Sequence, residues 1–396
     1  MSHDVLPPPL RPDASLHVLD ITKYFGSTTG GIRTYLMEKS GWVGRQHSLR
    51  QTLVVPGEAD GVTETAGVRC YRVRSPRIPF QRQYRAMVAP GIIRRIIEHE
   101  RPDVIEVGSP FLVPWMVHRA NRGLRVPVVW FFHSNVARLA APRSLEVPPH
   151  QRWRYELARR YVARVSHLFD AVVATSDFAE QDLRSAGVPE VRRVTMGLDL
   201  KCFHPDRQAL RDATRRRLGW PDGPVVVYLG RLAREKRIDV VVRAWRTIGP
   251  LTGATLVLMG DGPDRTRLFR LAAGGRVLWQ PHDSDRDRVA EALAAADVYL
   301  APGPVETFGL SALEAMGCGT PVVSVDRGAV PELVRRSEGG VTFPNGNADA
   351  LARTLETMLC QDLQAMGSSA RRYVERHHRW DEVFPGLFDM YRNIIP

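Results

Sequence analysis

Cysteine, lysine and long apolar runs are all scarce in this sequence. The four cysteines lie far apart, without any Cys-x-x-Cys pair: they are Cys70, Cys202, Cys318 and Cys360. This spacing argues against a zinc site or a disulfide framework and fits a reducing compartment. No stretch approaches the ~20 consecutive apolar residues that a membrane-spanning helix needs, and the Pro-rich beginning lacks the apolar core of a secretory signal. We therefore expect a cytoplasmic protein that is not integral to a membrane.

The charge is strongly basic and is carried almost entirely by arginine. The net charge is +12, and only four of the 55 basic residues are lysine. A basic surface attracts nucleic acid or anionic membranes without regard to sequence, but an arginine bias arises equally from a GC-rich genome. The charge therefore leaves peripheral contact with an anionic membrane open, and no nucleic-acid partner is expected from it.

The length and the apolar pattern predict two α/β domains. A single core stops growing at roughly 250 to 300 residues, so a chain of 396 residues is expected to divide. Short apolar runs alternate with amphipathic stretches, which is typical of buried parallel strands joined by helices. The strands expected in the first half are 16–21, 103–107, 126–132 and 171–175, and those in the second half are 225–229, 254–259, 277–279, 298–301 and 321–325.

This pattern predicts a domain organisation. Residues 1–15 form a flexible tail, 16–200 a first Rossmann-like domain, 201–375 a second one, and 376–396 a C-terminal helix that packs back on the first domain. Ligands of doubly wound sheets bind beyond the carboxyl ends of the strands. Functional side chains are therefore expected directly after strands.

Two glutamates bracket a predicted helix start after the strand at 298–301. On a continuous helix that opens near Phe308, Glu306 and Glu314 would lie roughly 12 Å apart along the axis and about 80° apart in rotation. This separation suits an elongated ligand, such as a sugar and a ribose joined by a diphosphate. The backbone amides of Gly309 and Leu310 favour an anion between them. An ordinary solvated glutamate is the alternative, but the helix around Glu314 is too apolar to favour it.

Two cations follow the strand at 225–229. Arg231 offers a planar fork and Lys236 a point charge, and both suit a diphosphate. Because lysine is so rare in this chain, its use at position 236 favours a function over a solvated surface charge. Fixed positive charge at this point would stabilise a departing diphosphate.

These segments resemble the retaining glycosyltransferases of family 4, which have the GT-B fold. The family's Gly-Arg-Leu-x-x-x-Lys stretch, Gly-x-Gly turn and Glu-x7-Glu motif stand here at 230–236, 260–262 and 306–314. The pattern is nearest to bacterial GDP-mannose-dependent α-mannosyltransferases and related lipid glycosyltransferases. The resemblance implies an α/β protein with two Rossmann-like doubly wound domains that face each other across a cleft, the first binding the acceptor and the second the nucleotide sugar. The Pro-Gly-Pro-Val segment at 302–305 departs from the family's Pro-Ser, so the loop near the sugar is expected to differ.

The resemblance also implies a role for each candidate residue. Glu306 and His133 would contact the transferred sugar, while Arg231 and Lys236 would hold the diphosphate; these four form the expected catalytic group. The other candidates are all expected to bind the donor through backbone amides, the ribose or the base: Gly31, His282, Phe308, Gly309, Leu310 and Glu314.

The expected reaction is transfer of a mannose- or glucose-type hexose, with retention, from a nucleotide diphosphate sugar to a lipid or saccharide acceptor. GDP-mannose is the first candidate donor and UDP-glucose the second. A glutamate nucleophile, as in retaining glycosidases, is the alternative to a same-face reaction in which the leaving diphosphate accepts the proton. No Asp-x-Asp motif demands a metal, so we expect no cofactor and no metal site; Mg²⁺ is allowed but not essential. Acceptor contacts are expected at 25–29 and 77–84.

Three other functions are compatible with parts of the sequence. A nicotinamide dehydrogenase would share the fold, but the segment 260–265 lacks the third glycine of its fingerprint. A nucleotide-sugar epimerase of GT-B fold does not account for the Glu-x7-Glu pattern. A non-catalytic basic protein that binds membranes or nucleic acid would leave both glutamates idle.

A basic amphipathic helix is predicted at 90–99, where four isoleucines lie beside two arginines. Such a helix can lie on anionic lipid. It can also pack its isoleucines on the sheet, as Rossmann helices ordinarily do, and this second arrangement is the favoured one. Peripheral contact with the inner face of the cell membrane therefore stays a secondary hypothesis.

Overall fold

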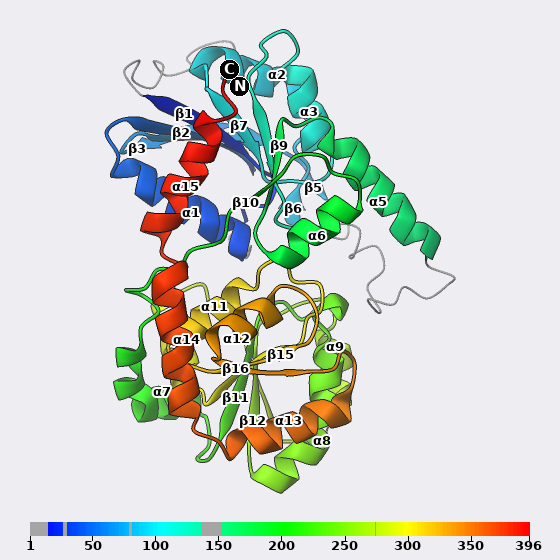
Figure 1. The fold of residues 1–396 in the computed structure, drawn as a ribbon, viewed down its shortest axis with the longest axis vertical. Coiled ribbons are helices and arrows are strands. Elements are labelled where there is room, and N and C mark those ends of the chain that lie inside the picture. Colours follow the sequence, from blue (N-terminus) through cyan, green and yellow to red (C-terminus); the bar gives the residue numbers. More distant parts are fainter. Residues whose placement is uncertain (1–14, 27–29, 79–80, 136–151, 274) are drawn as a thin grey trace.

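The computed structural model describes residues 15–26, 30–78, 81–135, 152–273 and 275–396, and the expected tail lies almost entirely outside them. Two α/β units, one above the other in Figure 1, are joined by two crossings of the chain. The predicted fold class, two doubly wound Rossmann-like domains, is confirmed by the two open sheets.

The first sheet has the order β10-β9-β8-β7-β1-β2-β4-β3. Its neighbouring strands pair in parallel, apart from β3, which runs antiparallel to β4. The strands are β1 (Leu16–Ile21), β2 (Leu49–Gly57), β3 (Gly61–Thr65), β4 (Val68–Arg74), β7 (Val104–Val107), β8 (Val128–Phe131), β9 (Ala171–Ala174) and β10 (Val191–Arg193), and a separate hairpin is formed by β5 (Arg77–Ile78) and β6 (Gln81–Arg85). Strand β2 was not predicted because its first half, Leu-Arg-Gln-Thr, is polar; all four side chains are nevertheless buried.

The helices of the first unit cover both faces of this sheet, as the doubly wound topology requires (Figure 1). They are α1 (Gly31–Gly44), α2 (Pro90–Glu100), α3 (Val113–Ala120), α5 (Arg152–Ser166) and α6 (Asp177–Ser185). In α2, the side chains of Ile93, Ile96 and Ile97 are buried in the core with strands β1 and β7. The isoleucines of this helix therefore pack on the sheet, which is the arrangement that the sequence favoured.

The second sheet is fully parallel, with the order β13-β12-β11-β14-β15-β16. Its strands are β11 (Val225–Leu229), β12 (Thr255–Met259), β13 (Val277–Gln280), β14 (Val298–Ala301), β15 (Val322–Val325) and β16 (Gly340–Phe343). Five of these six strands were predicted, because they read as continuous apolar runs. The strand order reverses between β11 and β14, which marks the point where such sheets bind ligands.

Three α-helices of the second unit begin at a side chain that caps the helix. Asp285 accepts hydrogen bonds at the start of α10, and Asn347 and Asp362 do the same for α13 and α14. The helical segments of this unit are η2 (Pro205–Leu210), α7 (Arg211–Leu218), η3 (Arg234–Lys236), α8 (Ile238–Thr252), α9 (Arg265–Leu271), α10 (Arg286–Ala295), α11 (Leu310–Gly317), α12 (Val330–Ser337), α13 (Ala348–Leu359) and α14 (Leu363–His377), and α15 (Trp380–Arg392) follows them.

The two crossings between the units lie side by side. The Leu198 amide donates to the His378 carbonyl at 2.7 Å, and Leu198 forms a parallel bridge with Arg379. At Gly197 a Cβ atom would lie 2.5 Å from the Trp380 ring, so only glycine fits at this contact. After the second crossing, α15 packs against α1 of the first unit (Figure 1).

Candidate active site

The loops that follow β11 and β14 carry the main sequence-predicted residues. Because the two strands are parallel neighbours, their carboxyl ends open at the same edge of the sheet. The loop after β11 contains Arg231 and Lys236, and the loop after β14 contains Glu306. The site is therefore built at the point where the strand order reverses.

An ion pair joins these two loops. The Lys236 ammonium contacts the Glu306 carboxylate, and both side chains are about one quarter exposed. A Cβ atom at Gly303 would lie 3.3 Å from Glu306 Oε1, so glycine lets this loop pass close to the pair. Arg231 is half exposed and lies 3.8 Å from Glu235, which leaves most of its guanidinium donors for a ligand.

The helix after Glu306 begins later than predicted. Gly309 has a φ of +92°, a left-handed conformation that interrupts any helix, so α11 starts at Leu310 and not near Phe308. The predicted separation of Glu306 and Glu314 assumed that both lie on one continuous helix. This assumption is wrong, because Glu306 lies in the loop before α11. At Gly309 a Cβ atom would also lie 2.3 Å from Val330 Cγ2.

The start of α11 is open to an anion. The amides of Gly309, Leu310 and Ser311 donate no hydrogen bond to any described residue. Such amides, together with the positive end of the helix dipole, favour negative charge. The predicted amide donors at Gly309 and Leu310 are thus available for a phosphate.

Glu314 lies on the partly exposed face of α11. Leu310, Ser311 and Glu314 are the helix positions that keep some exposure, whereas the residues between and after them are buried. Burial raises the pKa of Glu314 to about 7, opposed by the charge of Arg286. The described residues supply no hydrogen-bond donor to this carboxylate. A carboxylate in such surroundings is well placed to accept hydrogen bonds from ligand hydroxyls.

The first unit contributes two predicted residues. Gly31 begins α1 and faces α11, since a Cβ atom there would lie 3.7 Å from Leu310 Cδ2. His133 follows β8, and its carbonyl accepts a hydrogen bond of 2.9 Å from Thr307, the neighbour of Glu306. These two contacts bring both units to the same loop.

The His133 ring is neutral and has an unused nitrogen. Burial and the charge of Lys39 lower its pKa to about 3, and its Nε2 is buried without a hydrogen-bond partner among the described residues. The ring stacks on Phe131. A neutral imidazole of this kind does not suit proton donation near neutral pH.

Two of the predicted donor-binding residues, His282 and Phe308, do not lie on the open surface around α11. His282 is exposed and follows β13, the edge strand of the sheet, two strands away from β11. Phe308 is buried, and its ring packs edge-on against His378. The acceptor segments at 25–29 and 77–84 lie partly outside the described residues.

The sequence interpretation missed Arg286 and Thr307. Arg286 begins α10, contacts Glu38 of α1 and lies 3.8 Å from Asp199, so it links the two units beside Glu314. Thr307 bonds to the first unit through both its hydroxyl and its carbonyl. The only sequence signal for Arg286 was its position after the capping residue Asp285, and Thr307 was visible only as the residue beside Glu306.

Two negative findings complete the geometry. None of the helices in the described part of the chain has the length and hydropathy of a membrane span. The same residues hold no cluster of three or more metal-ligating side chains.

Comparisons with known proteins agree with this geometry. Residues 29–201 match the family described as Glycosyltransferase Family 4, and residues 211–379 match Glycosyl transferases group 1. The chain is 33% identical, over 91% of its length and 92% of the relative, to a GDP-mannose-dependent alpha-(1-6)-phosphatidylinositol dimannoside mannosyltransferase of Mycobacterium tuberculosis. It is 30% identical to a GDP-mannose-dependent alpha-mannosyltransferase of the same species, over 86% of the chain and 85% of the relative. Among solved structures, sucrose-phosphate synthase from Thermosynechococcus elongatus superposes with a TM-score of 0.76 at 21% identity, covering 96% and 99% of the two chains.

The fold and the site define a GT-B glycosyltransferase, an enzyme that transfers a hexose from a nucleotide sugar. The chain belongs to glycosyltransferase family 4. The dehydrogenase, epimerase and non-catalytic alternatives are therefore set aside.

Proposed function

We propose that the enzyme is a retaining α-mannosyltransferase that uses GDP-mannose and a lipid-linked acceptor. The observation that carries this proposal is the arrangement around α11: a Lys236–Glu306 ion pair at one end, open amides between, and, one turn further, Glu314, to which no described residue donates a hydrogen bond. This arrangement suits a sugar, a diphosphate and a ribose in that order. The mannose donor and the lipid acceptor rest on the relatives' names and on the resemblance.

In the proposed reaction the diphosphate is both leaving group and proton acceptor. Lys236, Arg231 and the amides of Gly31 and Leu310 stabilise the negative charge that develops as the sugar–oxygen bond breaks. Glu306 and the neutral His133 ring bind sugar hydroxyls on either side. The ion pair with Lys236 commits Glu306 to a charged, hydrogen-bonded role, which favours the same-face route over attack by Glu306.

A first experiment names the donor. Purified protein is incubated with GDP-, UDP- and ADP-sugars, and thermal stabilisation and slow release of nucleoside diphosphate are followed for the wild type, Glu306→Gln and the exposed control Glu356→Gln. A donor at 100 times its dissociation constant should stabilise the wild type by about 2.7 kcal/mol. We expect GDP-mannose to stabilise all three proteins, with hydrolysis lost only in Glu306→Gln. Absence of any effect from every nucleotide sugar would remove the proposed donor site.

Two further tests address the chemistry. Transfer should persist in excess EDTA, because the proposed leaving group is stabilised by protein cations; loss of transfer that Mg²⁺ restores would contradict metal independence. Azide added to Glu306→Ala should give no mannosyl azide of inverted configuration. Formation of that product would instead identify Glu306 as a nucleophile.

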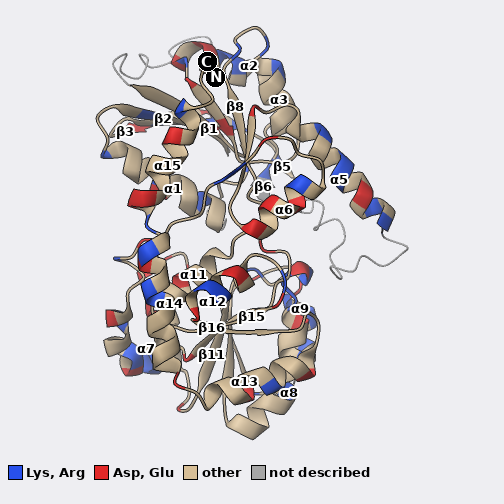
Figure 2. Ribbon diagram, viewed as in Figure 1, with Lys and Arg blue, Asp and Glu red and all other residues tan. Residues whose placement is uncertain are grey.

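Peripheral membrane contact on the cytoplasmic side remains part of the proposal, but on a different surface from the one the sequence suggested. On α5, Trp153 and Leu157 are 64% and 61% exposed, and Arg160 and Arg164 follow on the same helical face. Figure 2 shows arginines along this projecting helix. The exposed Trp115 of α3 lies next to Arg164, at the other end of this helical face. Such a surface suits insertion at an anionic bilayer.

The membrane contact is tested with vesicles of phosphatidylcholine that contain or lack phosphatidylglycerol. Binding should require the anionic lipid, weaken with salt, and fall in the double variant Trp153→Ser, Leu157→Ser. The matched control replaces the exposed Phe269 and Leu251 of the second unit by serine. Equal binding by both double variants would rule out the α5 surface.

A further inference from the structure

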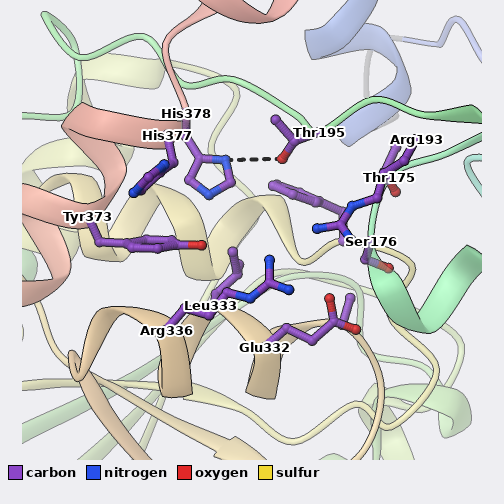
Figure 3. Close-up of a pocket in the computed structure, with 12 residues that line it drawn as sticks. Thr175, Ser176, Arg193, Thr195, Glu332, Leu333, Arg336, Tyr373, His377 and His378 are labelled. Atoms are coloured by element: carbon purple, nitrogen blue, oxygen red, sulfur yellow. Dashed lines mark hydrogen bonds between the residues drawn. The ribbon is translucent and has the colours of Figure 1, made fainter.

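A cavity of about 210 Å³ lies at the junction of the two units, outside the donor site. Its walls come from the ends of β9 and β10, from α12 and from the end of α14 (Figure 3). Phe308 also lines it, and the neighbouring Thr307 carbonyl accepts hydrogen bonds from Thr175 and Ser176 of the first unit. The cavity therefore adjoins the loop that carries Glu306, but apart from Phe308 it contains none of the proposed donor-binding residues.

His378 supplies the strongest sign that this cavity holds a ligand. The residue is 3% exposed, and its Nδ1 lies 2.8 Å from the Met196 carbonyl. Because a carbonyl can only accept, Nδ1 must carry the proton. Burial lowers the pKa of His378 to about 4, so the ring is neutral and Nε2 is a bare acceptor. Nε2 has no hydrogen-bond partner among the described residues, and in Figure 3 it faces the space between Tyr373 and Arg336.

The opposite wall offers cationic donors. Arg193 and Arg336, from different units, both contact the single carboxylate of Asp177. A guanidinium has five N–H groups, so both arginines keep donors for a second anion. The nearby Glu332 carboxylate is occupied: it accepts the amides of Asp177 and Phe178 at 3.0 and 2.6 Å.

The size of the cavity limits the ligand. Sites for drug-sized molecules measure about 300 to 1,000 Å³, so a volume of about 210 Å³ suits one sugar-sized ring and excludes a whole nucleotide sugar. A larger groove of about 530 Å³ along β10 and α15 shares Arg193, Thr195 and His377 with the cavity and so lies beside it.

We propose that this cavity binds a small phosphorylated sugar or polyol, with a ligand hydroxyl donating to His378 Nε2 and the phosphate accepting from Arg193 and Arg336. Because the walls belong to both units, the ligand binds best to one relative position of them and shifts the enzyme toward that position. The ligand phosphate also competes with Asp177 for Arg336. Ligand binding in the cavity therefore affects the contact between α6 and α12. This site is separate from the proposed donor site and does not depend on the identity of the donor.

The test measures binding of mannose 6-phosphate and myo-inositol 1-phosphate to the full chain by calorimetry, with mannose, inositol and inorganic phosphate as comparison ligands. Arg336→Gln and Tyr373→Phe alter the cavity, and Arg335→Gln is the matched control, since Arg335 is exposed on α12 and outside the lining. We expect Arg336→Gln to weaken binding roughly 10- to 100-fold, as for a lost hydrogen bond to a charged group. Arg335→Gln should leave the dissociation constant nearly unchanged.

Donor-site variants separate this proposal from the proposed function. Binding should be unchanged in Lys236→Met and Glu306→Gln even if these proteins lose all transfer. Weaker binding in Lys236→Met together with unchanged binding in Arg336→Gln would place the ligand in the donor site and overturn the proposal. Failure of both phosphate esters to bind at millimolar concentration would mean that the cavity holds water only. Equal affinity for inorganic phosphate would overturn the contact to His378.

Discussion

Lys39 is a buried charge at the contact between α1 and α15. Its side chain is fully buried, and its ammonium lies 2.8 Å from Asp20 Oδ1, 3.2 Å from Glu106 Oε2 and 3.0 Å from the Tyr391 hydroxyl. These partners come from β1, β7 and α15. Replacing Lys39 by methionine keeps a long apolar side chain but leaves two carboxylates in the core without their cation.

Removing one partner of a buried ion pair costs about 3–5 kcal/mol. For units of about 150–250 residues, each kcal/mol lowers the melting temperature by roughly 2–4 °C. Lys39→Met should therefore lower the melting temperature of the first unit by about 6 to 20 °C. The matched control is Arg45→Ala, which breaks an exposed ion pair between the residue after α1 and α15: Arg45 and Asp381 lie 3.3 Å apart but are 63% and 66% exposed. Exposed pairs contribute only about 0–1 kcal/mol.

The pH dependence adds a second check. Burial raises the pKa of Glu106 to about 7 in the folded protein, and Lys39 opposes that rise. Without Lys39 the folded-state pKa rises further, so the variant loses stability as pH increases above the ordinary value for a glutamate. The deficit of Lys39→Met should therefore be larger at pH 8 than at pH 5. A melting temperature within 2 °C of that of Arg45→Ala at pH 8 would refute this account of the cluster.

Three other predictions concern the donor site and the crossing. Glu314→Gln should weaken donor binding about 10- to 100-fold, because it removes hydrogen bonds to a charged group. The affinity of the wild type for the donor should fall as the pH drops below about 7, where Glu314 takes up a proton, and the affinity of the variant should not change with pH in this way. His133→Phe should abolish transfer but change the affinity for the nucleoside diphosphate little. The pH profile of wild-type transfer should show no ionisation of His133 between pH 5 and 8, because the pKa of His133 is about 3. An ionisation in that range that is present in the wild type and absent in the variant would contradict the neutral ring. Gly197→Ala should lower the free energy of unfolding by about 1–3 kcal/mol through the clash with Trp380. The control is Gly386→Ala in α15, where a Cβ atom meets nothing within 4 Å, and this change should raise the free energy of unfolding by up to about 1 kcal/mol. Equal melting temperatures of the two variants would refute the clash.

Strands buried on both faces could be predicted, because their apolar runs appear directly in the sequence. Four of the five predicted strands of the second sheet are of this kind, whereas the edge strand β13 is only partly buried. Strand β2 could not be predicted, since Arg50, Gln51 and Thr52 are polar. Two of them are satisfied by the neighbouring strand β1: Gln51 donates to Asp20, and the Thr52 hydroxyl pairs with His17.

The candidate site also has features that could be predicted from the sequence and features that could not. The residue types and spacing at Lys236, Glu306 and Glu314 indicated a nucleotide-sugar site, because each follows a strand or lies in a helix that follows one. The sequence shows a glycine at position 309, but it does not show that this glycine adopts a left-handed conformation. That conformation delays the start of the helix, so the geometry expected for the two glutamates was wrong.

The sequence by itself determined the two Rossmann-like units and the family, and it predicted the chemistry of the donor loops, because these depend on local patterns of apolar, cationic and acidic residues. Only the tertiary structure decided which side chains meet across the units. Lys39 reaches Tyr391 across 352 positions, and Glu332 accepts the amides at the start of α6 from 154 and 155 positions away. Such contacts depend on how two sheets and two chain crossings pack in space, and no local pattern of residues encodes that arrangement.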